Sequence, residues 1–164
     1  MILYHGSNVV VVQPKILQSE RLLDFGMGFY TTSNKEQAIR WAGRVAARRE
    51  SKDQVLTVYE FDLDTAGREL AIVQFEQPNE AWLDFVCLNR RGGTPLKPYD
   101  IAIGPVADDD VYGTVLLYEQ GILDSESALK RLKIRVLFDQ ILFHTEPALD
   151  FCRYLRHENV GGVV

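Results

Sequence analysis

Three short segments, far apart along the chain, carry the side chains best suited to chemistry. The first is Leu3-Tyr4-His5-Gly6-Ser7, in which a histidine at the end of a predicted strand lies beside a glycine. An imidazole nitrogen next to exposed backbone amide groups can hold a hydroxyl group and a carboxamide. A lone histidine is more often structural, and for His5 that alternative stays open.

The second segment is Asp24-Phe25-Gly26-Met27-Gly28-Phe29-Tyr30-Thr31-Thr32. Its two glycines let the backbone approach a ligand closely, because they accept conformations that a side chain would block. Tyr30 then offers a flat ring on which a planar ligand can stack. Packing in the core is the competing explanation for Tyr30.

The third segment is Phe138-Asp139-Gln140-Ile141-Leu142-Phe143-His144, a predicted strand. Alternation along a strand places Gln140 on the same face as Leu142 and His144, and Asp139 on the opposite face. A polar side chain on a mostly apolar strand must find partners or reach a cleft. Solvation at the surface would satisfy Gln140 equally well.

These segments must be positioned by alternating strands and helices. Apolar alternation predicts strands over 2–5, 29–32, 55–63, 69–73, 100–104 and 138–144. Helical spacing predicts helices over 33–49, 79–91, 109–120 and 125–132, with Ser33 and Glu36 forming a capping box. A last helix is predicted after Thr145, with Ala148, Phe151, Cys152 and Leu155 on its apolar side.

This irregular order of elements favours an α+β domain. A dinucleotide-binding doubly wound fold is rejected, because a strand and not a helix follows the glycine pair Gly26 and Gly28. The 164 residues, 46% of them hydrophobic, fit one domain over 1–164 with a substantial core. No segment is apolar and long enough to be a membrane span or a signal peptide, so we expect a cytoplasmic protein. Cys87 and Cys152 are expected to be buried thiols.

The net charge of −5, from 18 basic and 23 acidic residues, argues against a generic binder of duplex DNA. A local basic surface is compatible with this charge, since Arg40, Arg44, Arg48 and Arg49 fall on or near one side of a predicted helix. A solvated helix face is the favoured explanation of these four arginines.

Together, and in this order, the three segments resemble the ADP-ribosyltransferase superfamily, in particular the branch of diphtheria toxin and the poly-ADP-ribose polymerases. That branch has a histidine on its first core strand, a tyrosine after a glycine-rich turn and usually a glutamate on a later strand. The Asp-Phe-Gly-x-Gly-Phe-Tyr-Thr-Thr run, Gln37-Ala38 with Trp41-Ala42, and the stretch 99–109 also resemble a bacterial family of unknown function within this superfamily. The resemblance spans nearly the whole chain.

The resemblance implies an ADP-ribosyltransferase-like split β core with flanking helices, which clasps NAD. His5 would then bind the adenosine ribose, and the backbone of Gly6, assisted by Ser7, would grip the nicotinamide carboxamide. Tyr30 would stack on the nicotinamide ring, and Gly28 would let the backbone come close to that ring. Trp41 would be a second aromatic wall, although packing in the core is the favoured role for it.

Gln140 falls where the family usually has its glutamate. The carboxylate would stabilise positive charge that develops on the sugar, whereas an amide supplies only a dipole. A neighbouring carboxylate such as Glu146 is an alternative source of that charge, and favouring the start of its own helix is its simpler role. Asp100, Asp108 and Asp109 also recur in the family pattern, and for the last two helix capping is a sufficient explanation.

The leading hypothesis is an NAD-dependent mono-ADP-ribosyltransferase without a metal, in which His5, Tyr30 and Gln140 position the reactants. It would be a bacterial toxin or effector that modifies a protein or a nucleic acid and has an antitoxin or immunity partner. The second hypothesis is a module that binds NAD or ADP-ribose without turnover. The third is an interaction protein that uses the apolar helices around Trp82 and Leu129.

Overall fold

The computed structural model describes residues 1–17, 23–106, 109–132 and 138–161. Along these residues strands and helices follow one another in an irregular order. The strands are β1 (Ile2–Ser7), β2 (Phe29–Thr31), β3 (Val55–Phe61), β4 (Ile72–Gln74), β5 (Ile101–Pro105), β6 (Asp139–Phe143) and β7 (Cys152–Asn159). The helices are α1 (Lys35–Arg48), α2 (Leu63–Glu69), α3 (Glu80–Arg90), α4 (Asp109–Glu119), α5 (Ser125–Leu132) and α6 (Glu146–Leu149).

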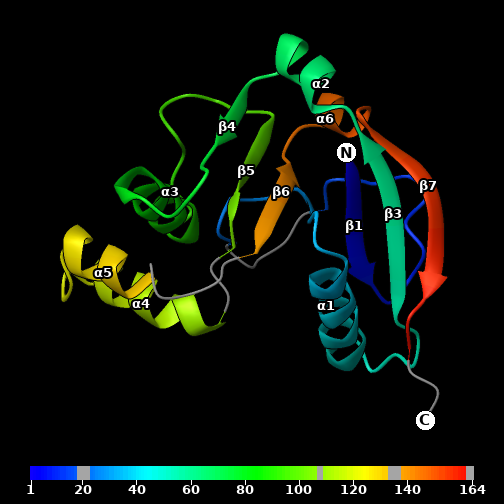
Figure 1. The fold of residues 1–164 in the computed structure, drawn as a ribbon, viewed down its shortest axis with the longest axis horizontal. Helices are drawn as coiled ribbons and strands as arrows, with labels where there is room; N and C mark the ends of the chain where they lie inside the picture. Colours follow the sequence, from blue (N-terminus) through cyan, green and yellow to red (C-terminus); the bar gives the residue numbers. More distant parts are fainter. Residues whose placement is uncertain (18–22, 107–108, 133–137, 162–164) are drawn as a thin grey trace.

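The strands form two sheets that lie side by side (Figure 1). One is antiparallel and has the order β1-β3-β7, and the other has the order β2-β6-β5-β4, with β4 and β5 parallel. A backbone bridge between Tyr4 and Thr32 joins the sheets, with N···O distances of 2.8 and 3.0 Å. The α+β class expected from the sequence is therefore confirmed, whereas the finer expectation of an ADP-ribosyltransferase core stays a prediction.

Helix α1 packs against β1 through small side chains. Ala38, Ala42 and Ala46 are its buried residues, and they recur every four residues along one side. The helix begins one residue later than predicted: Asn34, not Ser33, is the N-cap, and its side chain accepts a hydrogen bond from the Gln37 N–H. Ser33 instead donates its own N–H to Asp139 (3.0 Å), so the predicted capping box is wrong.

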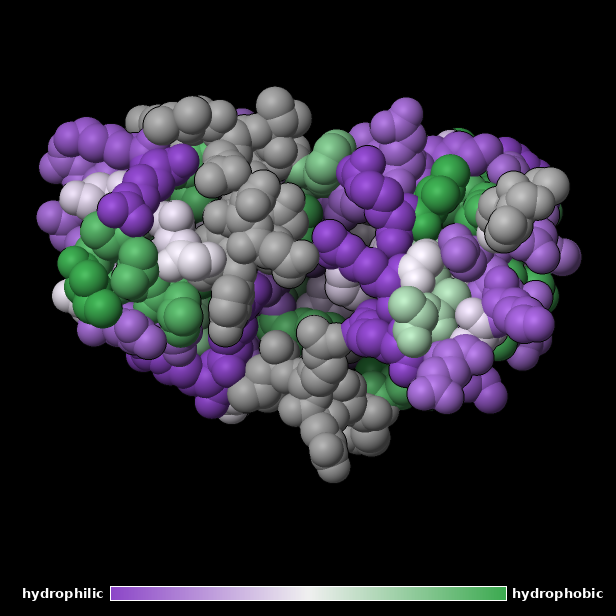
Figure 2. Space-filling model, turned by 90° about the horizontal axis from the view of Figure 1, so that it is seen from below, coloured by the Kyte–Doolittle hydropathy of each residue, from purple (hydrophilic) through white to green (hydrophobic). Residues whose placement is uncertain are grey.

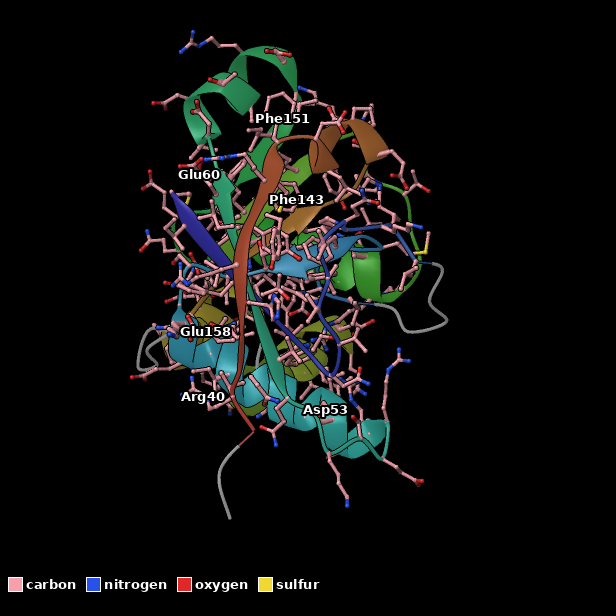
Figure 3. All side chains as sticks on the ribbon, turned by 90° about the vertical axis from the view of Figure 1, so that its right-hand side faces the viewer. Arg40, Asp53, Glu60, Phe143, Phe151 and Glu158 are labelled. Atoms are coloured by element: carbon pink, nitrogen blue, oxygen red, sulfur yellow. The ribbon has the colours of Figure 1, made fainter. Side chains whose placement is uncertain are left out.

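The side of β7 that faces the viewer in Figure 3 is rich in charge. Glu158 forms an ion pair with Lys35 at the start of α1 (2.7 Å), and Glu60 of β3 pairs with Arg153. The first pair ties the last strand to α1, and both pairs are exposed, so they add little to stability.

The core has two parts. One lies between the four-stranded sheet and helices α3, α4 and α5, and Trp82, Leu83, Val86 and Leu142 are fully buried in it. Asn79 caps α3, as the predicted helix over 79–91 requires. Trp82 is buried in this core and Leu129 packs against it, and the third hypothesis, a protein interface on these helices, stays a prediction.

The other part of the core joins the two sheets. Leu3 and Phe61 of the three-stranded sheet meet Ile141 and Phe143 of the four-stranded sheet there, and all four are fully buried. Phe61 and Phe143 are in edge-to-face contact, with ring centroids 5.2 Å apart. The two sheets thus share apolar packing at one end, and their backbones are bridged at Tyr4 and Thr32.

Two predicted elements are wrong in part. The strand predicted over 55–63 ends at Phe61, and Asp62 then caps α2, a helix that the sequence analysis did not predict. The last predicted helix is only the short α6, after which Cys152 begins the strand β7. The strand predicted over 69–73 is shifted to β4, and the helices predicted over 109–120 and 125–132 are confirmed as α4 and α5.

Both cysteines are buried and free, as predicted. Burial raises the pKa of Cys87, and it raises the pKa of Cys152 to about 12. Among the residues that the structure describes, no helix is both long enough and apolar enough to cross a membrane.

Candidate functional site

His5 lies on β1, at the point where the two sheets separate. Its Nδ1 is 2.7 Å from the backbone oxygen of Tyr30, and its ring lies 4.5 Å from the ring of Phe29. A carbonyl oxygen only accepts, so Nδ1 must carry the proton and donate it. Burial lowers the pKa of His5 below its ordinary value, so the imidazole is neutral at pH 7. Nε2 is therefore left as a hydrogen-bond acceptor.

Gly6 follows on the same strand and is buried. The N–H and C=O groups of Tyr4 are used in the bridge to Thr32, so they point away from β3. Alternation along an antiparallel strand gives the Gly6 amide group the same direction. Tyr4 and Thr32 are antiparallel partners in the bridge. Two residues further along β1 and two residues back along β2, Gly6 therefore lies opposite Tyr30.

The other side of Gly6 is filled by α1. A Cβ atom at Gly6 would lie 1.9 Å from the Ala38 oxygen and 2.7 Å from the Ala42 nitrogen. The absence of a side chain is therefore required for α1 to pack on β1. Ser7 ends the strand opposite Val55 and is half-buried, on the same face of β1 as His5.

Tyr30 lies on β2, and its phenol is held inside the loop that precedes it. The Tyr30 hydroxyl donates to the Gly26 oxygen (2.6 Å) and accepts from the Phe25 N–H (3.2 Å). Burial raises the pKa of Tyr30 well above its ordinary value, and the nearby charge of Asp24 raises it further. The phenol thus stays neutral and fixed, and the partly buried ring packs against the core between the four-stranded sheet and α3, as the competing explanation for Tyr30 expects.

The loop over 24–28 is itself anchored from several sides. Arg90 at the end of α3 bonds through Nε to the buried Asp24 carboxylate (2.7 Å). The Tyr99 hydroxyl donates to the Phe25 oxygen (2.5 Å), and the His144 Nδ1 lies 2.6 Å from the Met27 oxygen. These bonds come from three different parts of the chain, so the loop and the phenol form one rigid unit.

The two glycines of this loop have a clear structural role. Gly26 and Gly28 have φ angles of 88° and 151°, which favour glycine. A Cβ at Gly28 would lie 2.3 Å from the Phe143 oxygen. Gly28 therefore lets the loop pass directly against β6, and this packing accounts for its lack of a side chain.

Gln140 lies on β6, on the same face of the four-stranded sheet as Leu142, the partner of Tyr30 in the β2–β6 register. Its side chain is buried, and its Nε2 donates to the Pro105 oxygen across a long distance of 3.4 Å. The Trp82 Nε1 donates to the same oxygen at 3.1 Å. Gln140 therefore faces the α3 side of the sheet, whereas His5 belongs to the other sheet.

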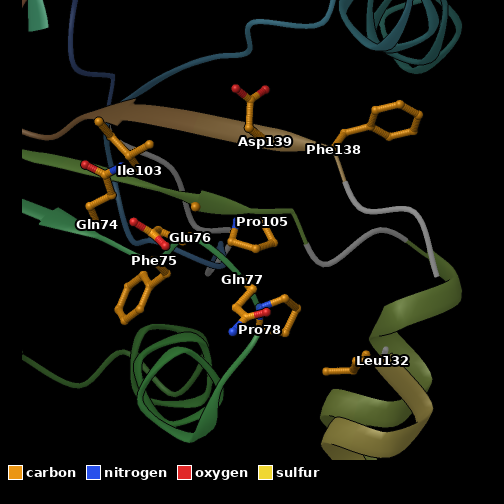
Figure 4. Close-up of a pocket in the computed structure, with 11 residues that line it drawn as sticks. Gln74, Phe75, Glu76, Gln77, Pro78, Ile103, Pro105, Leu132, Phe138 and Asp139 are labelled. Atoms are coloured by element: carbon orange, nitrogen blue, oxygen red, sulfur yellow. The ribbon is translucent and has the colours of Figure 1, made fainter. Parts of the chain in front are cut away.

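Asp139, one residue earlier, is a carboxylate that the sequence analysis left without a role. It accepts hydrogen bonds from the Thr32 hydroxyl (2.7 Å) and from the Ser33 N–H (3.0 Å). Figure 4 shows its carboxylate on the side of β6 away from Pro105 and Glu76. Asp139 thus fixes the turn between β2 and α1, next to the sheet bridge. The opposite orientations of Asp139 and Gln140, which the strand pattern predicts, are the signal that could have found it.

A pocket of about 460 Å³ lies at the same end of β6 (Figure 4). It is bounded by the ends of β4 and β5, the start of β6 and Leu132 of α5. Glu76, Pro105, Phe138 and Asp139 are among the residues that line it. In Figure 2 the molecule is seen to be hollowed between the half that holds α4 and α5 and the half that holds α1.

Trp41 is exposed, with 41% of its surface accessible, so the favoured expectation of core packing is wrong. The buried stripe of α1 consists of alanines, and Trp41 lies beside that stripe and not on it. The guanidinium of Arg48 lies 5.4 Å from the centroid of its ring. An accessible aromatic face is what a second wall of a ligand site requires.

Two further carboxylates singled out in the sequence lie away from Gln140. Glu146 is exposed in the first turn of α6, beyond the opposite end of β6, which agrees with its simpler role at a helix start. Asp100 accepts hydrogen bonds from the Thr145 hydroxyl (2.7 Å) and the Ala71 N–H (2.9 Å), so it joins β5 to two connections. Asp108 and the side chain of Asp109 lie outside the described residues.

The described part of the chain contains no group of three or more His, Cys, Asp or Glu residues placed to hold a metal ion. Of the predicted site residues, His5 and Tyr30 are joined by the hydrogen bond from the His5 imidazole to the Tyr30 backbone, whereas Gln140 is bonded to Pro105 on the α3 side of the four-stranded sheet. Over residues 1–154 the chain matches the family described as "Protein of unknown function (DUF3990)", and it belongs to that family. No curated protein and no solved structure matches it.

Proposed function

We propose that this protein is an NAD-dependent mono-ADP-ribosyltransferase, with NAD bound where the two sheets separate. The observation that carries the proposal is the state of His5, whose Nδ1 proton is committed to Tyr30, so that Nε2 can accept a ribose hydroxyl. The Gly6 amide, directed toward Tyr30, provides a donor and an acceptor for a carboxamide. The Tyr30 ring, which is only partly buried, offers a flat surface for nicotinamide.

In this reaction the bond between C1′ of the ribose and the nicotinamide nitrogen breaks, and its electron pair leaves with nicotinamide. Positive charge develops on the ribose, as in glycoside hydrolysis. The acceptor then donates a lone pair to C1′ and loses a proton to solvent. Gln140 contributes a dipole and a hydrogen-bond acceptor, whereas a carboxylate would add charge, so we expect slow turnover.

To test the proposal, the purified protein is incubated with a cell extract and with NAD that is labelled in its adenylate part. Transfer of the label and release of nicotinamide are both measured. Gln140→Glu is expected to raise the rate by about 10²-fold, the typical value of one preorganised electrostatic partner. His5→Ala is expected to abolish it. If neither the natural protein nor Gln140→Glu releases nicotinamide or transfers label, the proposal is wrong.

A second candidate is a module that binds NAD or ADP-ribose without turnover. It is favoured by the burial of Gln140 and its contact with Pro105, which engage the amide within the sheet. Calorimetry separates the two candidates, since this one requires heat of binding with no product. NAD at about 100 times its dissociation constant would stabilise the fold by about 2.7 kcal/mol in either case, and His5→Ala would remove that protection.

The proposal extends to a role as a bacterial toxin or effector that acts in the cytoplasm on a protein or nucleic acid, with an antitoxin or immunity partner. Expression from an inducible promoter in bacteria tests this part. The natural chain should arrest growth and His5→Ala should not, at equal protein levels. Growth that is equal in both cultures would contradict the toxin role while leaving the enzymatic proposal to its own test.

A further inference from the structure

One side of α1 carries a row of arginines with an exposed tryptophan among them. We call Arg40, Trp41, Arg44 and Arg48 the arginine stripe. The three arginines recur every four residues, so they follow one another about 6 Å apart along the helix axis. All four side chains are exposed, and the Arg48 guanidinium lies against the Trp41 ring.

The N-terminal end of the arginine stripe lies next to the start of β6. Gln37, which lies on the same side of the helix one turn earlier, donates through Nε2 to the Asp139 oxygen (3.4 Å). The guanidinium of Arg40 lies 4.9 Å from the centroid of the Phe138 ring, and Phe138 lines the pocket. Arg40 thus borders the pocket that Phe138 lines, and Arg44 and Arg48 follow one and two turns further along α1.

The charge of this helix is opposite to that of the chain. Helix α1 contains four basic residues, Lys35 and the three arginines of the stripe, and a single acidic one, Glu36. The chain as a whole carries −5. A positive surface next to the site, on an otherwise acidic protein, selects for an anionic partner at that place.

We infer that the arginine stripe binds single-stranded nucleic acid and presents it to the site as the acceptor of ADP-ribose. This inference rests on the proposed function. Guanidinium groups in a row neutralise successive phosphates, and an accessible tryptophan stacks on an unpaired base, an interaction of about 1–3 kcal/mol. Duplex DNA offers no unpaired base to Trp41. A nitrogen or oxygen of the bound strand would bond to C1′, nicotinamide would leave with the electron pair, and the displaced proton would pass to solvent.

Binding is tested with fluorescently labelled single strands of about 15 nucleotides, a length that covers one site of this kind. Fluorescence anisotropy compares the natural protein with Arg44→Glu/Arg48→Glu at several salt concentrations. The double variant should bind about tenfold or more weakly, and its salt slope should be smaller by about 1.4, the value for two phosphates of a single strand that are no longer neutralised. Arg68→Glu/Arg131→Glu, with the same change of charge on other exposed helices, is the matched control and should stay within about twofold.

The role of Trp41 is tested by tryptophan fluorescence. Trp82 is fully buried and hydrogen-bonded, so quenching by a single strand reports on Trp41. Quenching should be seen with single strands, should be absent with the corresponding duplex, and should disappear in Trp41→Phe. Equal quenching by duplex and single strand would overturn the role of Trp41 in reading unpaired bases.

Failure of this inference is distinguishable from failure of the proposed function, because NAD is tested in the same variants. Arg44→Glu/Arg48→Glu should retain thermal protection by NAD and nicotinamide release while losing transfer of label to the oligonucleotide. If the variant loses protection by NAD instead, the stripe serves the dinucleotide and the inference is wrong. Equal loss of oligonucleotide binding in the control variant, or label found on protein alone, overturns it as well.

Discussion

The two sheets hold their site residues in different ways. In the three-stranded sheet, His5 and Gly6 are placed by backbone pairing with β3 and by the close approach of the alanines of α1. In the four-stranded sheet, Tyr30 and Gln140 are fixed by hydrogen bonds of their own side chains. We conclude that Gly6 is sensitive to added volume, whereas Tyr30 and Gln140 are sensitive to the loss of a polar partner.

The largest effect is expected where volume is added to the three-stranded sheet. In Gly6→Ala the new methyl group meets backbone atoms of α1, which cannot rotate away, so α1 must shift. We expect a loss of about 3 kcal/mol in the free energy of unfolding, the upper end for overpacking. Urea unfolding measures it. Gly113→Ala is the control: nothing lies within 4 Å of a Cβ at that helical position, and it should be neutral or stabilising.

The next effect is expected where the loop over 24–28 loses its charged anchor. Arg90→Met removes the guanidinium that pairs with the buried Asp24 carboxylate. Because the Arg90 side chain retains 16% exposure, we expect the free energy of unfolding to fall by about 2 kcal/mol, which is less than the loss for a fully buried pair. Chemical denaturation of the two single variants and the double variant Asp24→Asn/Arg90→Met gives their coupling. Strictly additive losses would show that the pair does not act as a unit.

A smaller effect is expected when the phenol alone is removed. Tyr30→Phe leaves the Gly26 oxygen and the Phe25 N–H without their partner, at a cost of about 1 kcal/mol. Tyr118→Phe is matched to it, since the Tyr118 hydroxyl donates to Asp84 at 2.7 Å in an exposed setting. In thermal unfolding, the midpoint temperature of Tyr30→Phe should be clearly lower than that of Tyr118→Phe. The reverse order would contradict the expected cost of leaving the hydrogen-bond partners of Tyr30 unsatisfied.

The smallest effect concerns the pH dependence of stability that His5 confers. Since the folded pKa of His5 is below the ordinary value of 6.5, the unfolded chain binds more protons between these two values. The stability that His5 contributes is therefore fully present above pH 6.5, and it is lost as the pH falls toward the pKa that His5 has in the folded protein. The midpoints of urea unfolding are measured for the natural protein and for His5→Gln at one pH above 6.5 and at one pH below it. The midpoints of the two proteins should be closer together at the lower pH. A constant difference between them would contradict the lowered pKa.

Elements with clear local signals could be predicted from the sequence. The helix over 79–91 has an asparagine cap, an apolar face around Trp82 and a glycine pair after it, and the structure has α3 there. The separate faces of Asp139 and Gln140 also follow from strand alternation alone. The hydrogen bonds that hold Tyr30 and its loop could not be predicted, because their partners come from a turn, from α3 and from the segment before β5, and no local pattern relates these.

The C-terminal strand shows why one prediction failed. Phe151, Cys152 and Leu155 have helical spacing, but the register of β7 shifts opposite Val58 and Tyr59, so Leu155 is an extra residue in the strand. Residues on one face of a strand are normally two positions apart, and at such a bulge they are three positions apart. This spacing of three resembles the period of a helix. Tyr154 and His157, on either side of the bulge, come to lie on one face of the strand, with the Tyr154 hydroxyl 2.7 Å from the His157 Nδ1.

The state of the two cysteines has a practical consequence. Cys87 and Cys152 are shielded by the core, and their raised pKa values keep them as thiols at neutral pH, where only the thiolate reacts with maleimides. A cysteine introduced on the outer face of α1 would therefore be labelled selectively in the otherwise natural chain. Spectroscopic probes can thus be attached next to the gap between the sheets without first replacing either native cysteine.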